Sequence, residues 1–179
     1  MNEAKCDKAS RKYTIIKILG LISVVFLMLV SIAGAAQSLN IWSHKGSELI
    51  NSEKYNEAIK AYDKAIEINP HDSYAWDGKG VALGKLGKSD EAITAFDKAI
   101  EIYPQYSKAW YNKGLALDQL NKYDEAIKAF DKAIEVNPHY SAAWYNKAVI
   151  LNKLNKSDEA IRAYEKAIEI NPQLRSLAQ

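Results

Sequence analysis

The sequence has one cysteine, four prolines and eight glycines in 179 residues. A lone thiol cannot form a disulfide within the chain or supply a cysteine-based zinc site, which excludes a disulfide-stapled scaffold and a zinc finger. The scarcity of glycine excludes a collagen-like chain, and a hydrophobic content of 48% excludes a disordered one. What remains is a folded chain of about one-domain size.

An excess of charge of one sign is also lacking, because the net charge is only +2. Five lysine and arginine residues against two acidic ones give the first 36 residues a net charge of +3, so the remaining 143 carry −1. Binding to nucleic acid relies on clustered lysine and arginine that displace counterions from the phosphates. We therefore expect no nucleic-acid partner.

One long hydrophobic run stands near the N-terminus. Residues 18–36 contain no charged side chain and follow a basic, mostly polar lead, residues 1–17. As a helix the run would be roughly 28 Å long, close to the thickness of the bilayer core, and the basic lead favours the cytoplasmic side. We expect a single-pass membrane protein whose remaining residues lie outside the cytoplasm. The small residues at 33–36 also suit a signal peptidase, so secretion after cleavage near Ala36 stays an open alternative.

Tryptophan and proline recur with one period. The tryptophans are Trp42, Trp76, Trp110 and Trp144, and the prolines are Pro70, Pro104, Pro138 and Pro172, each 34 residues from the next. Further positions repeat in the same register, among them Gly46, Gly80, Gly114 and Ala148, and also Tyr62, Phe96, Phe130 and Tyr164. Independent residue types with one period predict a repeat architecture.

Each unit contains two helical stripes of apolar or small residues. In the first stripe a tryptophan, a small residue and a leucine stand at i, i+4 and i+7, and in the second an alanine, an aromatic residue and an alanine do. Each unit is therefore predicted to be a helical hairpin whose small residues lie where the two helices cross. Proline ends each second helix, and the serines that follow, Ser73, Ser107 and Ser141, are expected to be N-caps of the next helix.

This pattern, W-x3-G/A-x2-L followed by A-x3-F/Y-x2-A and a closing proline, resembles the tetratricopeptide repeat (TPR) family. The resemblance implies an all-α fold, a right-handed superhelical solenoid of four helical hairpins, here preceded by one transmembrane or signal helix. The expected units are residues 39–72, 73–106, 107–140 and 141–174, numbered one to four below, with a C-terminal tail at 175–179.

Motifs for catalysis are lacking, because the sequence has no nucleophile elbow, no phosphate-binding glycine loop and no cluster of metal ligands. We expect no enzyme activity, no cofactor and no metal site. In TPR proteins the stacked hairpins form a concave groove that commonly accepts an extended peptide or a helix of another protein. The predicted function is a protein–protein interaction scaffold.

The family's geometry assigns the groove to four positions of each first helix. Carried over, the lining is Asn40, Ser43, His44, Ser47, Tyr74, Asp77, Gly78, Val81, Lys108, Tyr111, Asn112, Leu115, Ala142, Tyr145, Asn146 and Val149. The candidate partner site within it consists of Tyr74, Asp77, Lys108, Tyr111, Asn112, Tyr145 and Asn146. Tyrosine offers rigid contact area and asparagine bonds a peptide backbone. Tyrosine and asparagine are also common consensus residues of the repeat at these positions. The alternative that they reflect the consensus and not a partner stays open.

Chaperone-binding members of the family hold the terminal carboxylate of their partner with five lysine, arginine and asparagine side chains. In units two to four those positions are occupied by Asp77, Val81, Asn112, Ala142 and Asn146, of which one matches. We therefore expect no binding of chaperone tails.

A second hypothesis is self-assembly. Few residues follow unit four, so its apolar edge near Ala160, Ile161, Tyr164 and Ile168 is expected to be partly exposed. Exposed apolar patches tend to be interfaces. Homo-oligomerisation through this edge is the alternative function.

Overall fold

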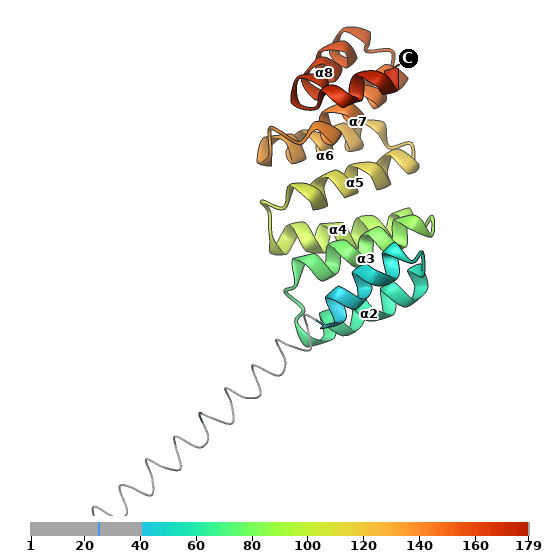
Figure 1. Ribbon diagram of the computed structural model, residues 1–179, viewed down its shortest axis with the longest axis vertical. Helices are drawn as coiled ribbons and strands as arrows, with labels where there is room; N and C mark the ends of the chain where they lie inside the picture. The colour runs from blue at the N-terminus through green and yellow to red at the C-terminus, as the bar shows by residue number, and fades with distance from the viewer. Residues whose placement is uncertain (1–24, 26–40, 179) are drawn as a thin grey trace, which may run out of the picture. The chain divides into compact units, whose positions relative to one another are not determined.

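The computed structural model describes Val25 and residues 41–178. Within this part of the chain the regular elements are all helices, with no strand. A first helix covers residues 41–51, and the helices that follow it are stacked one above another (Figure 1). They are α2 (Tyr55–Ile68), α3 (Ser73–Lys85), α4 (Ser89–Ile102), α5 (Ser107–Gln119), α6 (Tyr123–Val136), α7 (Ser141–Lys153), α8 (Ser157–Ile170) and the short 3-10 helix η1 (Pro172–Ala178).

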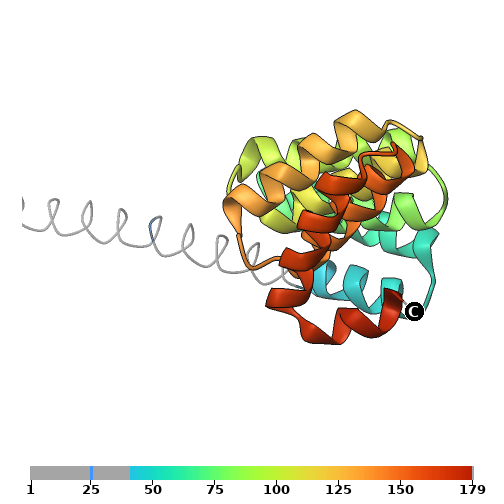
Figure 2. The same ribbon diagram turned by 90° about the horizontal axis from the view of Figure 1, so that it is seen from above.

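The helices pair into hairpins that stack on their neighbours. α3 packs against α4, α5 against α6 and α7 against α8, and each second helix also contacts the first helix of the next hairpin. The first helices of successive hairpins are also in contact, α3 with α5 and α5 with α7. Seen from above, successive hairpins lie at different angles (Figure 2). The predicted all-helical, superhelical arrangement is confirmed.

Glycines allow the two helices of a hairpin to approach closely. A Cβ atom at Gly80 would lie 2.6 Å from Cε1 of Phe96, and one at Gly114 would lie 2.5 Å from Cε1 of Phe130. Such distances are far below van der Waals contact, so no side chain fits at either position without a shift of the ring. The prediction that small residues mark the crossing of the helices is confirmed.

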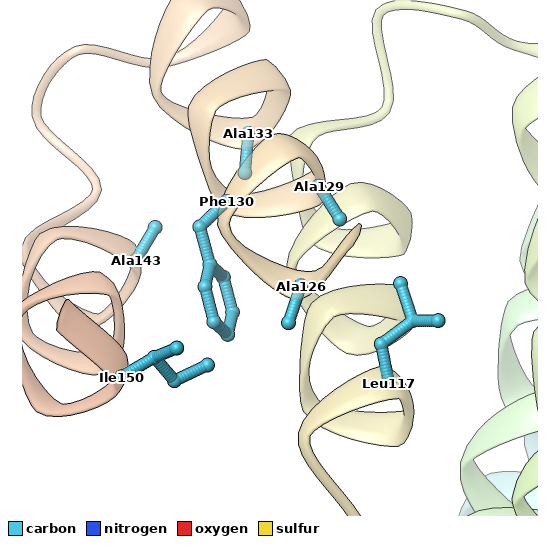
Figure 3. Close-up of a cluster of buried hydrophobic side chains, with 7 residues drawn as sticks. All are labelled: Leu117, Ala126, Ala129, Phe130, Ala133, Ala143 and Ile150. Carbon is cyan, nitrogen blue, oxygen red and sulfur yellow. The ribbon is translucent and has the colours of Figure 1, made fainter. Parts of the chain in front are cut away.

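The core of units three and four surrounds the ring of Phe130, which has no exposed surface. Figure 3 shows this ring pointing from α6 into the space between α5 and α7, with Ile150 on one side and Leu117 on the other. The alanines of the stripe are buried beside it. One aromatic ring thus joins its own hairpin to the next one.

The two residue types that revealed the repeat are bonded to each other. The indole Nε1 of Trp76, Trp110 and Trp144 donates to the carbonyl oxygen of Pro70, Pro104 and Pro138, respectively, at 3.0 Å in each case. Each bond ties the start of a first helix to the end of the preceding second helix. The constant six-residue spacing from proline to tryptophan was the sequence signal for it, and sequence reasoning missed the bond.

The prediction that Ser73, Ser107 and Ser141 are N-caps is wrong. Each of them is the first residue inside its helix, and the capping position lies one residue earlier. At α3 this residue is Asp72, whose carboxylate accepts from the backbone N–H groups of Tyr74 and Ala75. At α5 and α7 it is a tyrosine without a side-chain capping bond.

The expected membrane segment, residues 18–36, lies outside the described residues apart from Val25, and so does the basic lead. Among the residues that the structure does describe, no helix has the length and apolar character needed to cross a bilayer. The membrane segment therefore stays a prediction.

Candidate partner-binding groove

The candidate site residues lie on the three first helices α3, α5 and α7. Tyr74 on α3 is 63% exposed, whereas Asp77 one turn later is only 3% exposed. On α5 the side chain of Lys108 is exposed, and Tyr111 and Asn112 are half-buried. The two candidate residues on α7, Tyr145 and Asn146, are half-buried too.

Asp77 holds two of its neighbours in place. Its carboxylate accepts a hydrogen bond from Nδ2 of Asn112 at 2.8 Å and one from the hydroxyl of Tyr106 at 3.2 Å, and Nζ of Lys108 lies 3.9 Å away. Burial raises the pKa of Asp77, and the hydrogen bond from Asn112 opposes the rise. Asp77 was expected to face a partner, but its carboxylate is buried and bonded to side chains of its own chain.

The bonds of Asn112 and Asn146 leave each amide with a defined orientation. Nδ2 of Asn146 donates to the hydroxyl of Tyr111 at 3.1 Å and to the carbonyl oxygen of Ala142 at 2.9 Å. Since both bonds use the NH₂ group, Oδ1 of Asn146 is left as the acceptor. At Asn112 the NH₂ group bonds Asp77, so Oδ1 again points away from the bond. Two acceptors on neighbouring helices can receive backbone N–H groups of a bound chain.

Three tyrosines meet beside this network, from the start of α3, the end of α4 and the start of α5. The ring centroid of Tyr106 lies 5.0 Å from that of Tyr74 and 5.9 Å from that of Tyr103, and Tyr103 is 44% exposed. Burial, followed by the effect of the Asp77 carboxylate, raises the pKa of Tyr106, so its hydroxyl stays protonated as a donor. Exposed tyrosines of this kind supply contact area at a small loss of side-chain entropy.

Sequence reasoning missed Tyr103 and Tyr106. Tyr103 stands where the other three units have an asparagine, whose Oδ1 accepts from the backbone N–H two residues later at 3.1 to 3.2 Å. The second unit gives up this hydrogen bond and exposes an aromatic ring instead. That departure from the repeat was the signal that could have identified the position.

Tyr145 on α7 packs against the second helix of its own hairpin. Its ring centroid is 6.0 Å from that of Tyr164 on α8, and both rings line a pocket of about 290 Å³ with Ile161. The structure therefore brings together Tyr74, Asp77, Lys108 and Asn112 around the seam of α3 and α5, and Tyr111 with Asn146 at the seam of α5 and α7.

The surface along α3, α5 and α7 combines amide acceptors, tyrosine rings and the exposed side chain of Lys108. Within residues 25 and 41–178, no group of three or more histidine, cysteine, aspartate or glutamate side chains is arranged to hold a metal ion.

Replacing Asp77 by asparagine is expected to change how stability depends on pH. Burial raises the pKa of Asp77 above its unfolded value of about 3.9. The folded protein therefore holds this proton more tightly, and the associated stability is present below pH 3.9 and lost as the pH rises through the folded pKa. The wild type should gain stability relative to Asp77→Asn as the pH falls from 7 to 4, measured by urea unfolding of the full chain in detergent micelles.

Glu101→Gln is the matched control, because the hydrogen bond from Lys98 lowers the pKa of this exposed carboxylate. Its contribution is present at neutral pH and lost on acidification, so the difference from wild type should have the opposite sign. If the wild type instead lost stability relative to Asp77→Asn on acidification, the role given to burial would be wrong.

Comparison with known proteins agrees with this fold. The family model of the tetratricopeptide repeat matches residues 45–107 and 108–174. A crystal structure of MamA is similar, with a TM-score of 0.66 at 28% identity, covering 71% of this chain and 74% of that chain. The first TPR of Spaghetti (RPAP3), bound to the HSP90 peptide SRMEEVD, has a TM-score of 0.64 at 26% identity, covering 66% of this chain and 94% of that chain.

A structure of MamA from Desulfovibrio magneticus RS-1 supports the fold alone, with a TM-score of 0.68 at 21% identity, covering 75% of this chain and 76% of that chain. No curated protein matches the chain. The family match covers both pairs of units and extends over most of the chain, in agreement with the 34-residue period and the stacked hairpins. The chain belongs to the tetratricopeptide repeat family.

Proposed function

We propose that this protein is a scaffold that binds an extended segment of a partner protein along its first helices. TPR proteins are generally non-enzymatic scaffolds, and the fold is consistent with that role. The observation that carries the proposal is the pair of oriented amides, Asn112 and Asn146, at one position of consecutive units. Their Oδ1 atoms, to which no donor among the described residues bonds, suit the repeating N–H groups of a polypeptide backbone.

The peptide-bound relative supports this mode of binding but not the same peptide. The Spaghetti domain holds an HSP90 peptide. In this chain the five clamp positions include Asp77, Val81 and Ala142, and the Asp77 carboxylate is buried among donors of its own chain. We therefore propose a partner segment recognised by its backbone and side chains rather than by a terminal carboxylate.

The test is the amount of partner that copurifies with the full chain from its native membrane, quantified by mass spectrometry. Tyr74→Ala and Lys108→Glu change exposed side chains of the proposed site. Each is expected to lower the amount of partner at least about fivefold, the equivalent of about 1 kcal/mol. Lys128→Glu on α6 is the control and should leave it unchanged. Equal recovery with all three variants would contradict the proposal.

The proposal includes a membrane location that rests on the sequence. In this proposal, residues 18–36 form a single transmembrane helix and the basic lead 1–17 stays in the cytoplasm. The units at 39–72, 73–106, 107–140 and 141–174 then lie outside the cytoplasm. Secretion after cleavage near Ala36 is the alternative. Sequencing the N-terminus of the mature protein separates an anchored form from a secreted one.

A specific observation favours self-association as a second function. Ile161 on α8 is 56% exposed, whereas Ile59, Ile93 and Ile127 at the same repeat position are half-buried by the next unit. η1 covers another part of this edge, because the hydroxyl of Tyr164 donates to the carbonyl oxygen of Leu174 at 3.0 Å. A second copy could cover Ile161, and light scattering that shows a strict monomer at high concentration would exclude it.

A further inference from the structure

An apolar pocket opens at the seam between α3 and α5. Its volume is about 200 Å³, and its walls include Val81, Leu115 and the ring of Phe96. Asn112, the first of the oriented amides, lies on its lining, and so does Lys85 at the end of α3. A cavity of about 150 Å³ with apolar walls already accepts a benzene ring. The pocket is therefore large enough for one bulky apolar side chain.

The same seam is filled one unit later, between α5 and α7. Ile150, which is 1% exposed, stands 34 residues after Ala116 and fills the space beside Phe130. Asp118 stands 34 residues after Gly84, and its carboxylate accepts from Nζ of Lys153 at 2.7 Å. The fold thus accommodates larger residues at both positions, so the small residues of the α3–α5 seam are a feature of that seam and not a demand of the repeat.

Gly84 in particular has no packing reason to be glycine. A Cβ atom there would meet nothing closer than Cβ of Ala92 at 4.0 Å, an ordinary contact, unlike the crowded positions Gly80 and Gly114. Glycine inside a helix is also unfavourable relative to alanine. The open space in front of Gly84 is therefore retained at some loss of stability, which is expected where the space has a use.

A cation without a partner lines this pocket. Lys85 has the repeat position of Lys153, which pairs with Asp118 of the preceding unit. For Lys85, the residue of the preceding unit at the position of Asp118 is Ile50, which has no carboxylate. Among the described residues Lys85 forms no ion pair. An acidic side chain from outside would therefore complement this lysine.

We propose that the pocket between α3 and α5 receives a bulky apolar side chain of an extended partner segment that carries an acidic residue next to it. The apolar side chain packs between Val81 and Leu115, the acidic side chain pairs with Lys85, and Oδ1 of Asn112 accepts a backbone N–H. This inference rests on the proposed scaffold function and specifies the chemistry of the partner.

The test uses a defined probe on the full chain in detergent micelles. The probe is a tetrapeptide amide with a blocked N-terminus. Its residues are, in order, glycine, a photoreactive leucine analogue, aspartate and glycine. Its crosslinks are located and quantified by mass spectrometry. Crosslinks are expected on Val81 and Leu115. A competitor with leucine at the second position should suppress them at a concentration at least about tenfold lower than one with alanine, because burying a leucine side chain contributes that much affinity.

Two variants introduce the residues that the next unit itself carries. Ala116→Ile fills the pocket, and Gly84→Asp places a side chain and a negative charge in front of it, where nothing obstructs a Cβ atom. Both are expected to lower the crosslinking yield about tenfold or more. Thr94→Ile, on the exposed surface of α4, adds the same side chain elsewhere and should change nothing. Circular dichroism checks that each variant is folded. If Ala116→Ile does not fold, Gly84→Asp still tests the pocket.

Lys85→Ala tests the acidic residue, because it should weaken crosslinking of the aspartate probe but not of the same probe with asparagine. Crosslinks that persist in both pocket variants, or that lie outside the α3–α5 seam, overturn the inference. That result would leave the scaffold proposal standing if Tyr74→Ala and Lys108→Glu still released the partner. If these two variants had no effect either, the scaffold proposal would fail as well.

Discussion

Replacing Phe130 by alanine is expected to lower the free energy of unfolding by about 3–5 kcal/mol, the usual loss for a fully buried aromatic ring. The ring has no exposed surface and fills the space between α5, α6 and α7 (Figure 3). Its removal leaves a cavity between Leu117, Ile150 and the buried alanines of the stripe. Urea unfolding of the full chain in detergent micelles, followed by tryptophan fluorescence, measures the loss.

The damage from Phe130→Ala should also be local. Each described hairpin contacts only its neighbours, so its stability depends on its own packing and on its interfaces with the adjacent hairpins. Hydrogen exchange should rise most in α6 and α7 and least in α2. Lys128→Ala, at an exposed side chain of α6, is the control and should cost less than about 0.5 kcal/mol. A loss below about 1 kcal/mol for Phe130→Ala would contradict the described core.

The same substitution at two helical glycines is expected to have opposite effects. Gly84→Ala should stabilise the protein by up to about 1 kcal/mol, because alanine is the better helix former and the site is open. Gly114→Ala gains the same propensity but forces a Cβ atom to within 2.5 Å of the Phe130 ring. Overpacking of this kind costs about 1–3 kcal/mol, so the two variants should differ by that amount.

The urea-unfolding midpoints of the two glycine variants, measured side by side, test this expected difference in stability. The sequence itself offers a comparison, since unit four carries Ala148 at the position of Gly114. There the facing ring is Tyr164, which is half-buried, whereas the ring of Phe130 has no exposed surface. Equal stability of Gly84→Ala and Gly114→Ala would show that the helices do not cross as closely as described.

The 34-residue period was sufficient to predict the fold, because hairpins of a repeat array bury their surfaces only against neighbours of the same kind. The spacing of tryptophan and proline predicted the helical hairpins, but not the short 3-10 helix η1 that follows α8. The N-caps were wrong because serine is a common cap, whereas the local turn places Asp72 and the tyrosines at the capping position. Only the backbone geometry of the turn reveals that one-residue difference.

The candidate site was less predictable, since its side chains act across units. Asp77 is a groove position by register, but its burial depends on donors about 30 residues later, Tyr106 and Asn112. The pocket depends in the same way on Gly84 and Ala116, which are separated by nearly one unit. Both features coincide with departures from the repeat, and such departures are where a partner site in an array of similar units is best sought.

The most direct test of the scaffold account is crosslinking from single positions of the full chain in the cells that express it. A photoreactive phenylalanine analogue replaces Tyr74, an exposed ring of the proposed binding face, in one form and Lys128 on α6 in the other. We predict capture of one protein from position 74, reduced at least about fivefold by Lys108→Glu, and no capture of that protein from position 128. Capture from position 128 alone, or capture from position 74 that Lys108→Glu leaves unchanged, would contradict the account.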